Sequence, residues 1–132
     1  MTADERLTAV FDRAMQIGVD GLSPIERELY LIQYFILELE MNSLSGVFYN
    51  QPPDLAQLQE TVDAMRHHGL NALADLLADG LVLFRDYVEP HPPSTCNEIL
   101  RRYDPSNQLN LIESRMIALN NYGLSDSSIG SH

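Results

Sequence analysis

The side chains best suited to chemistry in this 132-residue chain are four histidines and one cysteine. Asp63 precedes His67 by four positions and His68 follows, so on a helix a carboxylate and an imidazole would share one face. Such a pair could hold a divalent metal ion, but zinc sites use three or four protein ligands. Alternatively the histidines end a helix, where they interact well with the negative end of its dipole, and Gly69 suits the next position. We expect no metal and no cofactor.

Other catalytic signals are weak. Cys96 has His91 five residues upstream, but the proline-rich stretch between them fixes no geometry, so we expect an inert, partly buried cysteine. Arg101 and Arg102 are expected to form surface ion pairs. The sequence contains no glycine-rich phosphate loop, His-Glu-x-x-His, Cys-x-x-Cys or nucleophile-elbow pattern. The chain is therefore expected not to be an enzyme.

The charge balance is unusual. There are 19 acidic residues against 8 basic ones, all of them arginine, giving a net charge of −11. This charge disfavours direct binding to nucleic acid or anionic membranes and favours basic partners, although many proteins are acidic only for solubility. The acidic N-terminus does not resemble a signal peptide, and no apolar run is long enough to span a membrane. We expect a cytoplasmic protein.

An acidic stripe is predicted on the helix that begins at Asn71. Asp75, Asp79 and Asp86 fall within an arc of about 40° at 100° per residue, and no arginine is spaced to neutralise them along the helix. Glu60 and Asp63 add carboxylates on the preceding helix. The stripe is either an ordinary solvated face or a surface that binds a basic partner.

Sequence signals for the starts and ends of helices indicate where these residues lie. Ser23-Pro24-Ile25-Glu26 is a capping box, and Asp54 is placed to cap another helix. No segment has the alternation of a strand, so we expect an all-α, single-domain irregular bundle of about six helices over residues 1–122, with a flexible tail over 123–132. The predicted helices cover residues 2–17, 24–41, 54–68, 71–88, 95–103 and 108–120, with a break at 42–46 and an extended connector at 89–93.

The helix after Ser23 is apolar on two sides. Its main face would pack in the core, and a second stripe contains Tyr30, Tyr34 and Met41. This helix is either the central core helix alone or a core helix that also supplies a subunit interface. We take Tyr30, Tyr34 and Met41 as candidate dimer contacts.

Several motifs together resemble one bacterial family. They are Leu22-Ser23-Pro24-x-Glu26-Arg27-x-Leu29-Tyr30, Glu38-x-Glu40-Met41-Asn42, Gly46-Val47-Phe48-Tyr49-Asn50 and the run from His67 to Leu77. They resemble the DMP-type family of bacterial DNA-mimic proteins, formerly a domain of unknown function, over about three-quarters of the chain. The family usually has Asn-Asn-Gly-Gly-Phe at the turn that contains Gly46-Val47-Phe48-Tyr49-Asn50 here, and this chain departs from the family pattern at Ser43-Leu44-Ser45. The resemblance implies a helical homodimer whose acidic side chains imitate DNA and occupy the DNA-binding surface of a transcription regulator.

Three hypotheses follow. In the first, Asp75, Asp79, Asp86, Glu60 and Asp63 form a mimic surface for a basic DNA-binding protein. In the second, the chain is an immunity or antitoxin-like protein that caps a toxin by shape. In the third, a metal near Asp63 and His67 serves a small enzyme. The resemblance favours the first.

Overall fold

The computed structural model describes residues 2–49, 54–87, 96–125 and 129. These residues form six α-helices and two short 3-10 turns without any strand, which confirms the expected all-α irregular bundle. The elements are α1 (Ala3–Ile17), η1 (Val19–Gly21), α2 (Pro24–Tyr49), α3 (Leu55–His67), α4 (Asn71–Leu83), α5 (Cys96–Tyr103), α6 (Gln108–Ala118) and η2 (Asn120–Gly123). Among the described residues, no helix combines the length and apolar character needed to cross a membrane.

Local hydrogen bonds explain where the helices begin. The Ser23 hydroxyl accepts from the Glu26 N–H at 3.2 Å, and the Glu26 carboxylate accepts from the Ser23 N–H at 3.0 Å, so the capping box is confirmed. Asp54 accepts from the Gln57 N–H at 2.9 Å, as expected for the cap of α3. The buried carboxylate of Asp104 accepts from the backbone N–H groups of Gln108 and Leu109 at the start of α6. These acceptors satisfy N–H groups that have no partner within their own helix.

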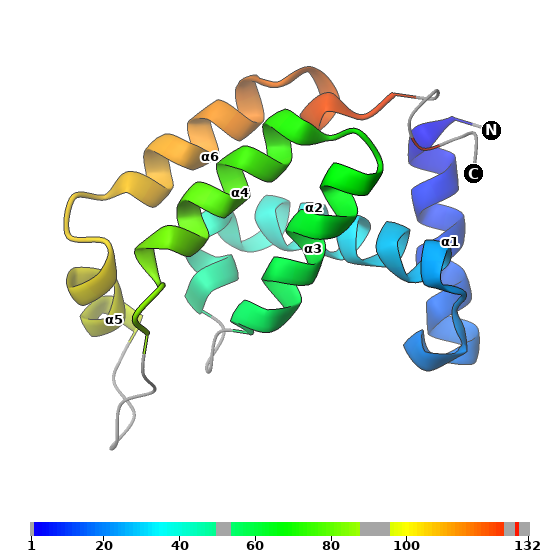
Figure 1. The fold of residues 1–132 in the computed structure, drawn as a ribbon, viewed down its shortest axis with the longest axis horizontal. Helices are drawn as coiled ribbons and strands as arrows, with labels where there is room; N and C mark the ends of the chain where they lie inside the picture. The colour runs from blue at the N-terminus through cyan, green and yellow to red at the C-terminus, as the bar shows by residue number, and fades with distance from the viewer. Residues whose placement is uncertain (1, 50–53, 88–95, 126–128, 130–132) are drawn as a thin grey trace.

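Helix α2 is the centre of the bundle. It contacts α1, α3, α5 and α6, while α4 packs on α3 and α6. In Figure 1, α3, α4 and α6 lie on one part of α2 and α1 lies at its other end, steeply inclined to it. The central-core position expected for this helix is therefore confirmed. Its fully buried side chains include Leu29, Ile32 and Phe35.

Stacked aromatic rings join α2, α5 and the turn that follows α4. The Phe84 ring stacks on Phe48 with centroids 4.6 Å apart and on Tyr103 with centroids 5.5 Å apart. Phe48 and Phe84 are almost completely buried. These three residues come from α2, the turn after α4 and α5, so the stack holds those parts of the chain together.

The predicted break in α2 occurs at Ser43, whose backbone has φ 66° and ψ 169°. The helix resumes at Leu44, three residues earlier than expected, and the Leu44 N–H donates to the Glu113 carboxylate of α6. The Ser43 hydroxyl also accepts from the Gly46 N–H at 3.4 Å. The positive φ at this break belongs to Ser43 and not to Gly46. Gly46 is required instead by close approach, since an added Cβ would lie 2.6 Å from the Asn42 Cβ.

Two helix ends differ from the sequence prediction. Helix α4 ends at Leu83 instead of about residue 88, and α6 ends at Ala118, two residues early. Ile129 is fully buried, so at least this residue of the predicted flexible tail packs on the domain. The connector at 89–93, which includes His91, lies outside the described residues.

Candidate acidic surface and neighbouring sites

Helix α4 separates apolar and acidic side chains as the sequence predicted. Leu73, Ala74 and Leu77 are buried, whereas Asp75 and Asp79 are exposed. Their spacing of four residues places both carboxylates on one side of the helix. Two members of the predicted stripe therefore share a helical face.

The third member of the stripe is not on the helix. Asp86 is exposed but follows α4 in a turn, where the Phe84 and Arg85 N–H groups donate to Leu81 and Val82 carbonyls. Helical periodicity therefore does not place Asp86 beside Asp79, and the predicted arc of three aspartates was wrong at this residue. This turn begins at the C-cap Phe84, whose ring packs in the buried stack.

Arginines from other helices neutralise two of the acids. Arg66 of α3 pairs with Asp75 at 2.7 Å. Arg27 of α2 pairs with Glu60 at 3.1 Å. The absence of a basic residue along α4 therefore did not mean an absence of one in space. In each pair both side chains are largely exposed, and such pairs stabilise a protein by about 0–1 kcal/mol.

The other three acids have no arginine partner among the described residues. Asp63 accepts a hydrogen bond from the Gln59 amide at 3.2 Å, and no ion pair joins Asp63, Asp79 or Asp86 to another residue in the described part of the chain. All three are exposed. Helix α3 packs against α4, and the Arg66–Asp75 pair links them, so Asp63 and Asp79 lie on neighbouring helices.

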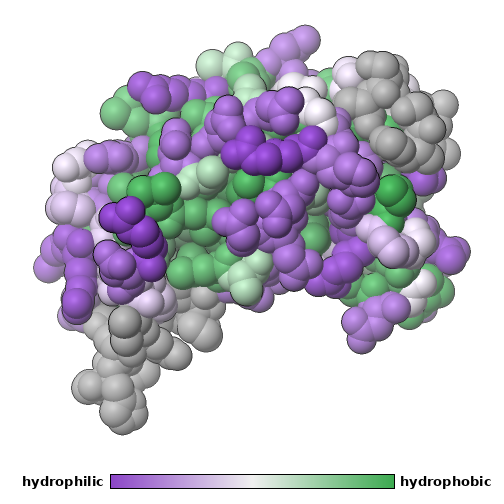
Figure 2. All heavy atoms as spheres, in the orientation of Figure 1, coloured by the Kyte–Doolittle hydropathy of each residue, from purple (hydrophilic) through white to green (hydrophobic). Residues whose placement is uncertain are grey.

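This surface is not uniformly polar. Figure 2 shows one face of the molecule, on which hydrophilic residues surround patches of hydrophobic ones. Val82 of α4 and Leu111 of α6 are each 58% exposed, and they line a groove of about 560 Å³ together with Asp79 and Arg115. A partner of this surface would thus meet both carboxylates and apolar side chains.

The candidate dimer residues have different environments. The Tyr30 ring stacks on Phe11 of α1 with centroids 5.5 Å apart, so it packs within the chain. Tyr34 is 37% exposed and Met41 is 79% exposed. Of the three, Met41 offers the most apolar surface to another molecule.

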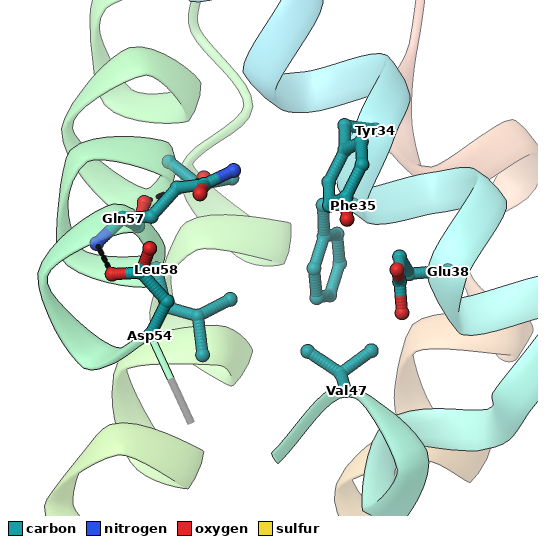
Figure 3. A pocket seen from close by; sticks show the side chains of 8 residues that line it. Tyr34, Phe35, Glu38, Val47, Asp54, Gln57 and Leu58 are labelled. Carbon is teal, nitrogen blue, oxygen red and sulfur yellow. Dashed lines mark hydrogen bonds between the residues drawn. The ribbon is translucent and has the colours of Figure 1, made fainter. Parts of the chain in front are cut away.

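A pocket of about 190 Å³ lies between α2 and α3 (Figure 3). Phe35, Val47 and Leu58 supply apolar walls, and Tyr34 faces Gln57 across the opening. Burial raises the pKa of Tyr34, and a hydrogen bond to Glu38 adds to this shift. Glu38 and Asp54 make the polar side of the pocket acidic, which suits a small cationic group.

The two adjacent histidines lie beside a glutamate that the sequence did not indicate. His67 Nδ1 lies 2.8 Å from Glu28 Oε2, and His68 Nε2 lies 3.5 Å from Glu28 Oε1. Asp63, proposed from its spacing as the partner of His67, is not part of this cluster. Glu28 was missed because it is 39 positions away on α2, and no local pattern connects it to His67.

A family model described as DMP19-like protein matches residues 20–127 of this chain. The match includes α2 through α6 and therefore both acidic helices. Neither a curated protein nor a solved structure matches the chain.

Proposed function

Because the chain belongs to the DMP19-like protein family, we propose that it is an acidic protein-binding module that occupies the DNA-binding surface of a basic DNA-binding protein, such as a transcription regulator. This family is the one that the motifs in α2 and around His67 resembled. The proposed action is competition with DNA, with no catalytic step.

The observation that carries the proposal is the set of exposed carboxylates on α3, α4 and the turn after α4 that no described arginine neutralises. Asp63, Asp79 and Asp86 form this set, hereafter the unpaired acids. Exposed carboxylates can meet the lysines and arginines with which a protein contacts DNA phosphates. The net charge of −11 adds a long-range attraction to a basic surface.

The two paired acids have a smaller expected role. Asp75 and Glu60 keep exposed side chains, but a partner's cation must compete there with Arg66 or Arg27. This competition reduces what either carboxylate contributes to binding. The unpaired acids should therefore dominate the partner's response to mutation.

A charge-removal experiment tests whether the unpaired acids contribute more to binding than the paired ones. The protein is immobilised, its bound DNA-binding protein is identified from a lysate and purified, and affinities are then measured by calorimetry. Asp79→Asn with Asp86→Asn should weaken binding roughly 5- to 30-fold, if each exposed charge contributes about 0.5–1 kcal/mol. The matched control, Asp75→Asn with Glu60→Gln, removes the same number of charges and should weaken binding less.

Competition with DNA decides between the hypotheses. Duplex DNA should displace the partner, and the affinity should fall steeply as salt concentration rises. A partner that resists both DNA and salt would contradict the mimic proposal and support the immunity or antitoxin-like alternative. Equal effects of the two double variants would show that the unpaired acids are not the contact surface.

We also propose that the protein acts as a homodimer that uses the outward side of α2. Met41 is the most exposed large apolar side chain of the described residues, and Tyr34 is partly exposed on the same helix. Burying such side chains against a second copy removes apolar surface from water. A dimer would also present two acidic surfaces to one partner.

A further inference from the structure

One cluster lies outside the proposed contact surface and contains three side chains with metal-binding atoms. Glu28 lies on α2, His67 is the last residue of α3, and His68 is the C-cap of α3. One ligand atom from each of these residues lies within 4.8 Å of the other two. Imidazole nitrogen with carboxylate oxygen is a ligand set that zinc accepts readily.

The backbone holds both histidines toward α2. His68 is the C-cap of α3, and the chain then turns through Gly69 at φ 80°. The Gly69 N–H donates to Arg66 and the Leu70 N–H donates to Met65, which is the hydrogen-bond pattern of a Schellman motif. Because this motif fixes the end of α3, two adjacent histidines can both face Glu28. Their ring centroids lie 5.2 Å apart.

The distances match those between ligands of one ion. Two atoms bound about 2.0–2.2 Å from zinc lie roughly 2.8–3.6 Å apart at tetrahedral or octahedral angles. His67 Nδ1 and Glu28 Oε2 are 2.8 Å apart, and His68 Nε2 and Glu28 Oε1 are 3.5 Å apart. Each imidazole thus lies at ligand spacing from one oxygen of the carboxylate, His67 from Oε2 and His68 from Oε1, while the three ligand atoms together span up to 4.8 Å.

Burial differs across the cluster in a way that suits an ion with one open position. The His68 side chain is completely buried, that of Glu28 is 26% exposed and that of His67 is 60% exposed. The cluster therefore has an inner wall and an accessible edge, through which an ion can enter and a water molecule can complete four ligands. The negative end of the α3 dipole also favours a cation here.

We propose that Glu28, His67 and His68 form a binding site for a divalent transition-metal ion of the zinc class, which would tie the first turns of α2 to the end of α3. Binding needs neutral imidazoles and an ionised carboxylate, so the metal replaces the hydrogen-bonding proton between His67 and Glu28. The site does not depend on the proposed DNA mimicry, and either can fail without the other.

The test is a Zn²⁺ titration of untagged, EDTA-dialysed protein by calorimetry, with melting temperature as a second readout. We expect saturable binding of about one ion per chain and a higher melting temperature with Zn²⁺, since an ion that binds the folded state stabilises it. Glu28→Gln and His67→Gln, both at accessible positions, should each weaken binding about tenfold or more.

Three controls separate this site from other sources of binding. Asp63→Asn and Asp79→Asn should leave the affinity within about twofold, because neither residue belongs to the cluster. Mg²⁺ should not displace Zn²⁺, because it prefers oxygen ligands and would favour the acidic surface instead. Absence of saturable binding, displacement by Mg²⁺, or loss of affinity in Asp63→Asn but not in Glu28→Gln would each overturn the proposal.

Discussion

At the scale of single residues, Ser43 has the most unusual backbone among the residues that the structure describes. Its φ of 66° and ψ of 169° lie in a region that is populated almost only by glycine and that costs about 1–3 kcal/mol for other residues. The serine hydroxyl offsets part of this strain energy by accepting a long hydrogen bond from the Gly46 N–H.

We predict that Ser43→Gly stabilises the protein by about 1 kcal/mol, because glycine relieves the strain and only a weak cap is lost. Urea unfolding at neutral pH measures the change. Ser43→Ala is the control, since alanine loses the hydroxyl and keeps the strain, so it should be destabilising. If Ser43→Gly were as destabilising as Ser43→Ala, the strain would not be present.

Glu26 gives a prediction about pH. The hydrogen bond from the Ser23 N–H to its carboxylate holds the pKa of Glu26 below its ordinary value of 4.5, and the nearby Arg13 guanidinium adds to this effect. A lowered folded-state pKa means that the unfolded state binds more protons as the solution is acidified. The stabilisation from Glu26 is thus complete well above pH 4.5 and is lost as the pH falls through the folded-state pKa.

We therefore expect Glu26→Gln to be less stable than the wild type at pH 7, with the difference shrinking below about pH 4.5. Melting temperatures of both proteins across the acidic range measure this convergence. A stability difference that stays constant from pH 7 to the lowest pH would show that the charge of Glu26 has no role in the cap.

At the scale of elements, the break in α2 depends on how closely its two parts approach. The hydrogen atom of Gly46 occupies space where a Cβ would lie 2.6 Å from the Asn42 Cβ, a distance that side chains do not tolerate. The Glu113 carboxylate of α6 satisfies the Leu44 N–H that the break leaves free. The second part of α2 is therefore positioned by both α6 and its own first part.

We predict that Gly46→Ala destabilises the fold by about 1–3 kcal/mol, because the backbone of α2 must shift to admit the new methyl group. Gly21→Ala is the matched control, since its Cβ would meet only the flexible Ile17 side chain at 3.1 Å. Chemical unfolding of the two variants gives the comparison. Similar free energies of unfolding for both would indicate that the approach to Asn42 is not limiting.

At the scale of the whole molecule, two methionines distinguish a subunit interface from ordinary exposure. Met41 on α2 is 79% exposed and Met15 on α1 is 76% exposed, so neither contributes much to the core of one chain. Only Met41 belongs to the proposed dimer surface. The pair therefore provides a test in which the size, chemistry and exposure of the mutated side chain are matched.

We predict that Met41→Asp shifts the protein from dimer to monomer, because a charge buried in an apolar interface is costly, and that Met15→Asp does not. Analytical ultracentrifugation over a range of concentrations measures both. Helical circular dichroism should stay unchanged in each variant. A dimer that survives Met41→Asp would place the interface elsewhere, and a monomeric wild type would remove the homodimer from the proposed function.

The sequence by itself determined the helices and their starts. Capping at Ser23 and Asp54 depends on side chains only three residues from the N–H groups they satisfy, so a short stretch of sequence contains the whole interaction. The apolar spacing of α2 likewise predicted its central position. The end of α4 could not be predicted in this way, because its C-cap Phe84 packs on rings from α2 and α5, which no local sequence pattern connects to it.

Only the tertiary structure decided which charges meet. Arg66 reaches Asp75, Arg27 reaches Glu60 across 33 positions, and Glu28 reaches His67 across 39. Such pairs depend on how helices pack after they form, since a side chain's neighbours along the sequence do not determine its neighbours across a bundle. Composition therefore determined that the protein is acidic, and helical spacing predicted that Asp75 and Asp79 share one face of α4. Packing determined which carboxylates remain unpaired and which one faces the two histidines.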